Sequence, residues 1–149
     1  MILMARPTEK QKIGRLGEDI AKKYLENKGF TVIGRNYRKK CGEIDIIAQK
    51  GKILHFIEVK SVSRENINCF DDNVSELASS RLGRRVTDNY RPEDNIHLTK
   101  LKRLARTVQV YLLEKYPKSE PEWVFDAITV RIDTKNRQAH MKFLADIAL

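Results

Sequence analysis

The stretch that decides the fold is residues 42–60, GEIDIIAQKGKILHFIEVK. Two runs rich in isoleucine and other apolar residues, 42–48 and 53–59, flank a short polar segment that contains Gly51. Runs of this length and composition around a glycine-containing turn predict a β-hairpin. Successive side chains of a strand point to opposite faces. The expected faces of the first strand are Ile44, Ile46 and Ala48 on one side and Glu43, Asp45 and Ile47 on the other.

Acidic residues of this hairpin converge in either of two registers. A two-residue turn at 50–51 places Asp45 diagonal to Glu58, and a turn at 51–52 places it directly opposite. Cross-strand neighbours of both kinds lie about 4.5–8 Å apart on one face of a sheet. Lys60 follows Glu58 on the same face. The sequence leaves the register open, but both alternatives bring carboxylates together beside a lysine.

Like charges that face each other destabilise a sheet, so these carboxylates need a compensating cation. A divalent ion with oxygen ligands, Mg2+ or Mn2+, meets this need. A metal beside Lys60 suits phosphodiester hydrolysis, in which the metal polarises the phosphate and activates water. The alternative is that Asp45, Glu58 and Lys60 are ordinary strand-end charges that face water.

A helix is predicted over residues 8–28, with Thr8 as its N-cap and Gly29 as the residue that ends it. Apolar residues at helical spacing predict its buried stripe. That stripe consists of Ile13, Leu16, Ile20 and Tyr24. Glu18 lies on a neighbouring stripe, at the margin of the face that we expect to pack on the core.

The whole chain, residues 1–149, predicts a single α+β domain with a mixed sheet flanked by two helices. Between the hairpin and the second helix, residues 61–97 are polar and too long for an ordinary connection. We expect this insertion to be mobile, and to order on a partner or cover the site. The other expected elements are a strand at 30–33, a helix at 100–116 capped by Thr99, and strands at 123–132 and 139–144.

The formal net charge of +9 and the pI of about 9.6 favour a polyanionic partner, nucleic acid before a membrane surface. A charged surface without a partner is the alternative.

No run approaches the roughly 20 apolar residues of a membrane span, and residues 1–12 lack the apolar core of a secretory signal. We therefore expect a cytoplasmic protein with no membrane partner. Cys41 and Cys69 form no CxxC and are expected to be reduced thiols.

Basic residues suited to contact with a phosphate backbone gather before the hairpin and on the second helix. They are Arg35, Arg38, Lys39, Lys40 and Arg103. Cations in the first half of a helix that begins at residue 100 would oppose its macrodipole, which indicates a use such as phosphate contact. A solvated basic face is an equal alternative.

Several of these motifs carry a family resemblance. They are Gly14–Glu18, Gly29–Phe30, Asn36–Arg38, Gly42–Ala48 and Phe56–Lys60, with further similarity at 97–113 and 125–126. Taken in this order, they resemble the YraN family of small bacterial proteins. The family is predicted to be related to archaeal Holliday-junction resolvases, in the restriction-endonuclease-like superfamily that is named for its PD-(D/E)xK motif.

The resemblance implies a three-layer, restriction-endonuclease-like fold and carries roles onto four residues of this sequence. Asp45 matches the aspartate of the motif, and Glu58 and Lys60 match its (D/E)xK pair. Glu18 matches a helical glutamate that resolvase-like members place near the metal. The implied catalytic residues are therefore Glu18, Asp45, Glu58 and Lys60, and the first three are the implied metal ligands.

Two further residues, Glu43 of the GEID signature and Lys100, which matches a family lysine, are candidates for supporting the site. The sequence departs from the family pattern at some positions. No proline precedes Asp45, and Val124 stands where the family often has arginine. The insertion at 61–97 also looks longer than the usual connection, so the type of substrate is not carried over.

The expected function is a Mg2+- or Mn2+-dependent endonuclease that hydrolyses phosphodiester bonds in DNA rather than RNA, with branched DNA as an implied substrate. Related resolvases act as dimers, so the resemblance also implies a homodimer. The alternative is a non-catalytic nucleic-acid-binding module, because one fold can host several functions.

Overall fold

The computed structural model describes residues 4–63 and 92–149, with the backbone alone at 92–97. It confirms the α+β prediction: a five-stranded mixed sheet, in the order β1-β2-β3-β4-β5, lies between two helices. The elements are α1 (Glu9–Asn27), β1 (Thr31–Lys39), β2 (Gly42–Lys50), β3 (Ile53–Ser63), α3 (Pro92–Lys115), β4 (Trp123–Asp133) and β5 (Gln138–Leu144). Neighbouring strands are antiparallel except β3 and β4, whose parallel pairing requires the crossover that contains α3.

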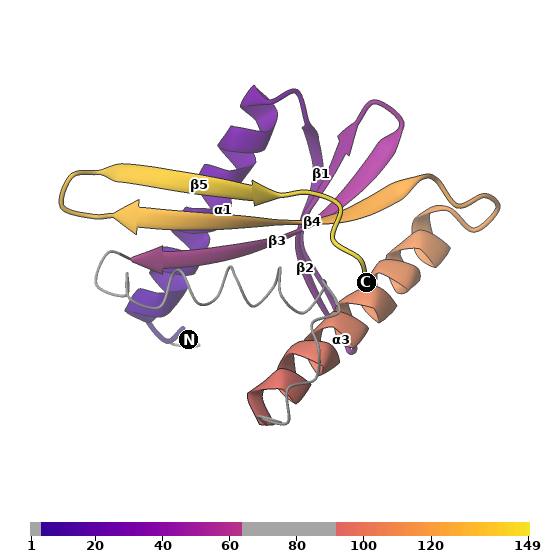
Figure 1. The fold of residues 1–149 in the computed structure, drawn as a ribbon, viewed down its shortest axis with the longest axis horizontal. Helices are drawn as coiled ribbons and strands as arrows, with labels where there is room; N and C mark the ends of the chain where they lie inside the picture. Colours follow the sequence, from indigo (N-terminus) through magenta and orange to yellow (C-terminus); the bar gives the residue numbers. More distant parts are fainter. Residues whose placement is uncertain (1–3, 64–91) are drawn as a thin grey trace.

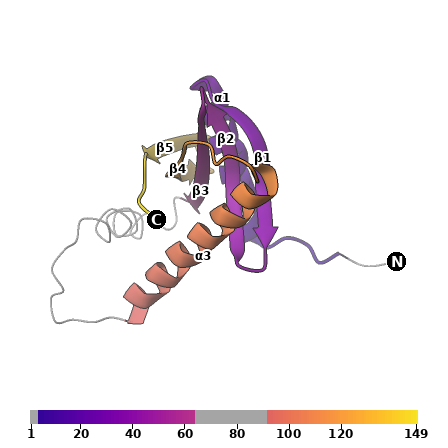
Figure 2. The ribbon, with the colours of Figure 1, turned by 90° about the vertical axis from the view of Figure 1, so that its right-hand side faces the viewer.

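In the described parts of the chain, each face of the sheet is covered by one helix, which gives three layers. Figure 1 shows α1 behind the sheet and α3 in front, and Figure 2 shows the same layers from the side. On the α1 side, Ala21 and Leu25 of the helix pack on Ile46, Ile57 and Ile128. On the α3 side, the buried cluster includes Leu104, Val108, Phe56 and Phe125. None of the helices in the described parts of the chain is both long and apolar enough to cross a membrane.

The face that α1 turns to the sheet differs from the prediction. Its buried residues are Gly17, Ala21 and Leu25, whereas Leu16 of the predicted stripe is 44% exposed. The small residues decide the outcome, because Gly17 lets the helix approach the Ser61 side chain of β3 closely. The apolar stripe, by contrast, marks only the edge of the contact, where Ile13, Ile20 and Tyr24 are partly buried.

β1 and α3 extend furthest beyond their predicted bounds. β1 runs to Lys39, so the basic stretch at 35–39 belongs to a strand rather than to a loop. α3 begins at Pro92, a residue that the first helical position tolerates well. Thr99 is therefore inside the helix and not its N-cap, and the macrodipole argument for the cations at 100–106 is wrong. Most of the predicted insertion, 64–91, lies outside the described residues.

The hairpin adopts the second of the two expected registers. Lys50 pairs with Ile53, and Gly51 occupies the turn with a φ of +60°. The predicted faces of β2 hold only in part: Ile46 and Ala48 pack on the α1 side, but Ile44 joins the α3 side. The strand therefore changes faces at Asp45.

Two glycines of α1 provide a matched test of this packing. A Cβ at Gly17 would lie 2.6 Å from Ser61 Cβ, which no rotamer change can relieve, whereas a Cβ at Gly14 would meet nothing within 4 Å. We expect Gly17→Ala to lower the free energy of unfolding by about 1–3 kcal/mol through overpacking. Gly14→Ala should raise it by up to about 1 kcal/mol through helix propensity. Urea denaturation of both variants measures the difference, and equal effects would contradict the close approach.

Candidate active site at the end of the β2–β3 ladder

Asp45 stands where β2 separates from β3. The ladder between these strands ends with Ile46 opposite Ile57. One residue further, the side chain replaces the backbone: the Val59 amide donates a 2.8 Å hydrogen bond to Asp45 Oδ2. The carboxylate is thereby held inside the sheet rather than in solvent.

Three other carboxylates surround Asp45. Burial, followed by the charges of Glu58, Glu18 and Glu43, raises the pKa of Asp45 to about 7, against the opposing effect of the Val59 hydrogen bond. Two of these neighbours are themselves largely buried, with side-chain exposures of 14% for Glu58 and 18% for Glu18. The predicted convergence of Asp45, Glu58 and Glu18 is therefore present in the structure, and it carries an electrostatic cost.

Asn36 connects two of these carboxylates from β1. Its side-chain amide lies 3.1 Å from Glu43 Oε1 and 3.3 Å from Glu18 Oε2. Both neighbours are acceptors, so the amide nitrogen is the atom that faces them. Asn36 has a φ of +51° and is skipped, together with Asp45, in the ladder between β1 and β2. Sequence reasoning assigned it no role, although asparagine is among the residues that tolerate this left-handed backbone.

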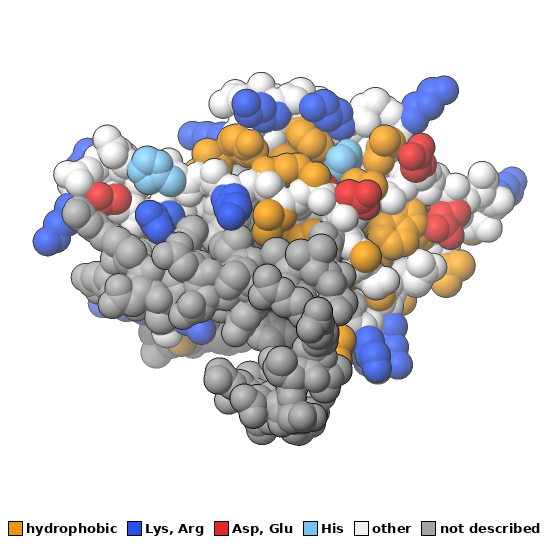
Figure 3. Space-filling view, in the orientation of Figure 1, with side chains coloured by type: hydrophobic (Ala, Val, Ile, Leu, Met, Phe, Trp, Pro, Cys, Tyr) orange, Lys and Arg blue, Asp and Glu red, His pale blue; other side chains and the backbone are white. Residues whose placement is uncertain are grey.

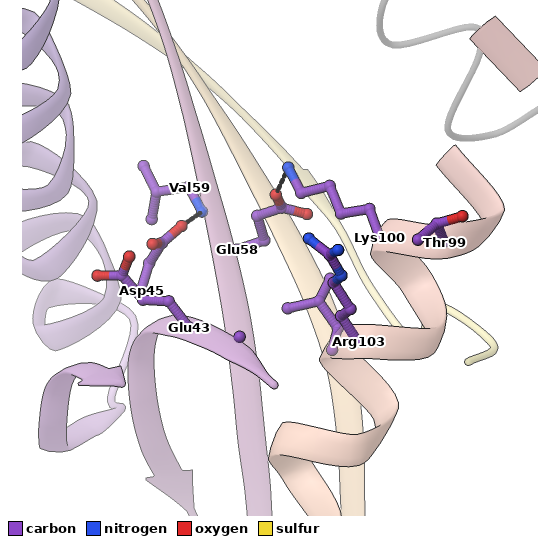
Figure 4. A pocket seen from close by; sticks show the side chains of 9 residues that line it. Glu43, Asp45, Glu58, Val59, Thr99, Lys100 and Arg103 are labelled. Atoms are coloured by element: carbon purple, nitrogen blue, oxygen red, sulfur yellow. Dashed lines mark hydrogen bonds and ion pairs between the residues drawn. The ribbon is translucent and has the colours of Figure 1, made fainter. Parts of the chain in front are cut away.

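The opposite wall of the site comes from α3. Lys100 Nζ forms an ion pair with Glu58 Oε1, and Thr99 and Arg103 line the same cavity of about 790 Å3. Figure 4 shows Glu43 and Asp45 on β2, Glu58 on β3, and Lys100 and Arg103 reaching toward them from the helix. Carboxylates and cations thus face each other across one open space.

Gly42 sets how closely this helix approaches. A Cβ there would lie 2.9 Å from Thr107 Oγ1 and 3.6 Å from the Arg103 carbonyl oxygen. Cys41, a free thiol, lies with its Sγ 3.4 Å from the same Thr107 hydroxyl. The glycine at the start of β2 therefore lets α3 pack directly against the strand that carries Asp45.

Lys60 is placed differently from Lys100. It lies two residues after Glu58 on β3, opposite Thr129 of β4. The described residues that line the cavity do not include it, whereas they include Lys100, which contacts Glu58. The alternation of β3 nevertheless puts Lys60 and Glu58 on the same face.

Three of the cations that were expected to bind nucleic acid also contact carboxylates of this chain. Arg35 Nη2 lies 2.8 Å from Asp19 Oδ1 and 3.6 Å from Glu18 Oε2. The other two contacts are Arg38 Nε to Glu43 Oε1 at 3.0 Å and Lys39 Nζ to Glu114 Oε1 at 2.7 Å. Lys40 is exposed beside the β1–β2 turn. Arg35 and Arg38 therefore neutralise the outer carboxylates of the site.

His55 faces away from the site. Its Nδ1 lies 2.5 Å from Asp126 Oδ2, and its ring packs edge-on against Phe30. Asp126 is fully buried and also accepts a 2.8 Å hydrogen bond from the Asp146 amide. Asp126 thus fixes the segment that follows β5.

Comparison with known proteins identifies the family. Residues 17–130 match the model of the uncharacterised protein family UPF0102. The chain belongs to this family. It is 34% identical to a UPF0102 protein of Clostridium kluyveri over 134 residues, which cover 90% of this chain and 91% of that protein. It is 38% identical to a UPF0102 protein of Campylobacter jejuni over 120 residues, which cover 80% and 84%.

Another match is shorter and has a higher identity. A relative from Campylobacter lari is 67% identical over 48 residues, 32% of this chain and 43% of that protein. The YraN resemblance is thereby confirmed at the level of the family. Within the residues that the structure describes, no group of three or more His, Cys, Asp or Glu side chains is arranged to hold a metal ion.

The raised pKa of Asp45 predicts a pH-dependent stability. A carboxyl whose pKa is higher in the folded than in the unfolded state costs stability once it ionises, so the cost begins above about pH 4 and is complete above about pH 7. Asp45→Asn keeps an acceptor for the Val59 amide and removes the charge. As the pH rises through this range, the free energy of unfolding of the variant should therefore increase relative to that of wild type, by at most about 4 kcal/mol.

Denaturant unfolding at pH 5 and pH 8, in a buffer that contains EDTA, measures this gain. Glu26→Gln on the exposed side of α1 removes a carboxylate outside the cluster and serves as the control. The same pH dependence in wild type and in Asp45→Asn would contradict the electrostatic account.

Proposed function

We propose that this protein is a metal-dependent nuclease that hydrolyses phosphodiester bonds in DNA and acts in the cytoplasm. The observation that carries the proposal is the acidic cluster at Asp45, which faces a cationic wall on α3. A divalent metal would relieve the repulsion among the carboxylates. The cations opposite would meet the charge of a phosphate.

Asp45 and Glu58 fit Mg2+ or Mn2+ as ligands. Carboxylate oxygens suit these ions, and Mg2+ usually keeps several waters beside one or two protein carboxylates. Glu18 lies close enough to raise the pKa of Asp45 and would become a third ligand only if its side chain moved, because no three such side chains in the described residues are arranged to hold an ion. When bound, such an ion polarises a phosphate oxygen and lowers the pKa of water.

The remaining residues of the site would orient the substrate. Lys100 and Arg103 on α3 present donors to phosphate oxygens, and charge-assisted hydrogen bonds of this kind are the stronger ones. Lys100 would move from Glu58 to the phosphate as Glu58 takes up the metal. Lys60, next along β3, is proposed to hold the attacking water.

One observation favours a second candidate, a non-catalytic nucleic-acid-binding module. The Lys100 ammonium already neutralises Glu58, so this carboxylate has a counter-ion of its own. In such a module, Lys100 would stabilise the fold and no metal would bind. Metal titration separates the two candidates.

Cleavage assays test the proposed activity. Wild type, Asp45→Asn and Glu58→Gln are incubated with Mg2+ or Mn2+ and labelled linear, single-stranded or branched DNA, with RNA for comparison. We expect wild type and the Glu26→Gln control to cleave DNA, and the two site variants to lose at least about 100-fold in rate. If wild type and Asp45→Asn give equal amounts of cleavage product on every substrate, the proposed nuclease activity is refuted.

Isothermal titration with MnCl2 tests the metal site independently of cleavage. Wild type should bind Mn2+, and the double variant Asp45→Asn/Glu58→Gln should not. Circular dichroism confirms that the variant is folded. Indistinguishable titrations, with salt-dependent DNA binding retained, would favour the non-catalytic module.

A further inference from the structure

The segment that forms most of α3 carries cations without acidic residues beside them in the sequence. Residues 95–113 contain no aspartate or glutamate, and their lysine and arginine residues are Lys100, Lys102, Arg103 and Arg106. Lys100 is paired with Glu58, and Arg103 lines the cavity of the site. Lys102 and Arg106 belong neither to that ion pair nor to the described lining of the cavity, so their charges need another explanation.

Lys102 and Arg106 lie on the outer side of α3. Both are exposed, whereas Leu104 and Val108 of the same helix are buried in the core beneath it. Residues three or four apart are neighbours on the surface of a helix, with Cβ atoms about 5–6 Å apart. Arg106 is therefore next to both Lys102 and Arg103. These three side chains form one basic strip, the α3 strip, which begins at the cavity wall and continues over the outer surface of the helix.

The cations of the α3 strip differ from those of β1 in their surroundings. Arg35, Arg38 and Lys39 each contact a carboxylate of this chain. Among the described residues, by contrast, no carboxylate forms an ion pair with a member of the α3 strip. The strip therefore keeps its full charge for a ligand in solution.

The charges of the strip do not help the helix to fold. Like charges at i and i+4 destabilise a helix, and Lys102 and Arg106 have this spacing. An anionic ligand would remove the repulsion between them. Without such a ligand, the two residues would be a solvated basic surface.

The dimensions of the strip suit a phosphate backbone. A helix rises 1.5 Å per residue, so Lys102 and Arg106 are separated by about 6 Å along its axis. One strand of a DNA duplex carries a phosphate about every 3.4 Å along the duplex axis, so the strip matches the spacing of nearby phosphates. Figure 3 views the molecule from the side of α3 and shows exposed lysine and arginine side chains at several places on it, which would add long-range attraction for a polyanion.

We propose that the α3 strip binds the phosphate backbone of DNA next to the phosphate that enters the candidate active site. This inference rests on the proposed function, because the substrate is taken to be DNA. Arg103 would contact the backbone at the edge of the cavity, and Arg106 and Lys102 would contact the phosphates that follow outside it. Such contacts fix the position of the strand and carry no base specificity.

Fluorescence anisotropy with a labelled DNA duplex tests the assignment over a series of NaCl concentrations, in EDTA so that no cleavage occurs. The double variant Lys102→Gln/Arg106→Gln removes two charges of the α3 strip. The double variant Lys10→Gln/Lys23→Gln removes two charges from exposed positions of α1, on the other face of the sheet, and is the matched control. Circular dichroism and urea denaturation confirm that both variants are folded.

Each lost phosphate contact should reduce the slope of log K against log salt by about 0.9, so the α3 variant should lose about twice that amount. We also expect it to bind the duplex severalfold more weakly than wild type at low salt, and the α1 variant to stay close to wild type. Equal slopes for the two double variants would show a solvated surface and overturn the proposal, and so would a wild type that does not bind DNA.

Mn2+ titration separates this failure from that of the metal site. If the α3 variant binds DNA as the α1 variant does while Asp45→Asn/Glu58→Gln loses Mn2+, the α3 strip is wrong and the metal site stands. If the α3 variant alone loses DNA affinity and wild type binds no Mn2+, the strip stands and the metal-dependent nuclease is wrong.

Discussion

The hydrogen bond from the Val59 amide to the Asp45 carboxylate is the interaction on which the site depends. It substitutes for a rung of the β2–β3 ladder and so keeps the two strands together where their backbones part. It also fixes a carboxylate in a half-buried place beside three others, where water compensates its charge poorly. The acidic cluster is therefore a consequence of where the β2–β3 ladder ends. Its repulsion favours the binding of any ligand that neutralises the carboxylates.

The second requirement is a helix that reaches this same corner. α3 packs against β2 because Gly42 leaves room for Thr107 and the Arg103 backbone. Lys100 then stands about one turn before Leu104, and Arg103 directly before it, at the start of the buried part of the helix that continues to Val108. Anchoring by this core holds the cations in position opposite Glu58, so that both walls of the cavity are built on rigid elements.

The strongest sequence patterns gave correct predictions. The alternating apolar runs predicted the hairpin. Both possible turns also predicted that Asp45 and Glu58 lie close together. The change of faces at Asp45 was not predicted; it coincides with the left-handed backbone of Asn36 in the neighbouring strand, and both residues are skipped in the β1–β2 ladder. The contact face of α1 was misjudged because close packing selects small residues such as Gly17, whereas periodicity detects large ones.

The remaining differences concern long-range contacts. Arg35, Arg38 and Lys39 formed an obvious basic run, but their carboxylate partners come from α1, β2 and α3. Charge counting along a sequence cannot reveal such partners.

The order of the strands has a consequence for how the chain acquires its structure. β1, β2 and β3 are joined by tight turns, so they can associate through local contacts and bring Asp45 close to Glu58 early. Lys60 and Thr129, by contrast, are neighbours across a parallel pair that closes a long loop, which is slow. We therefore expect Asp45 and Glu58 to be brought together before α3 supplies Lys100.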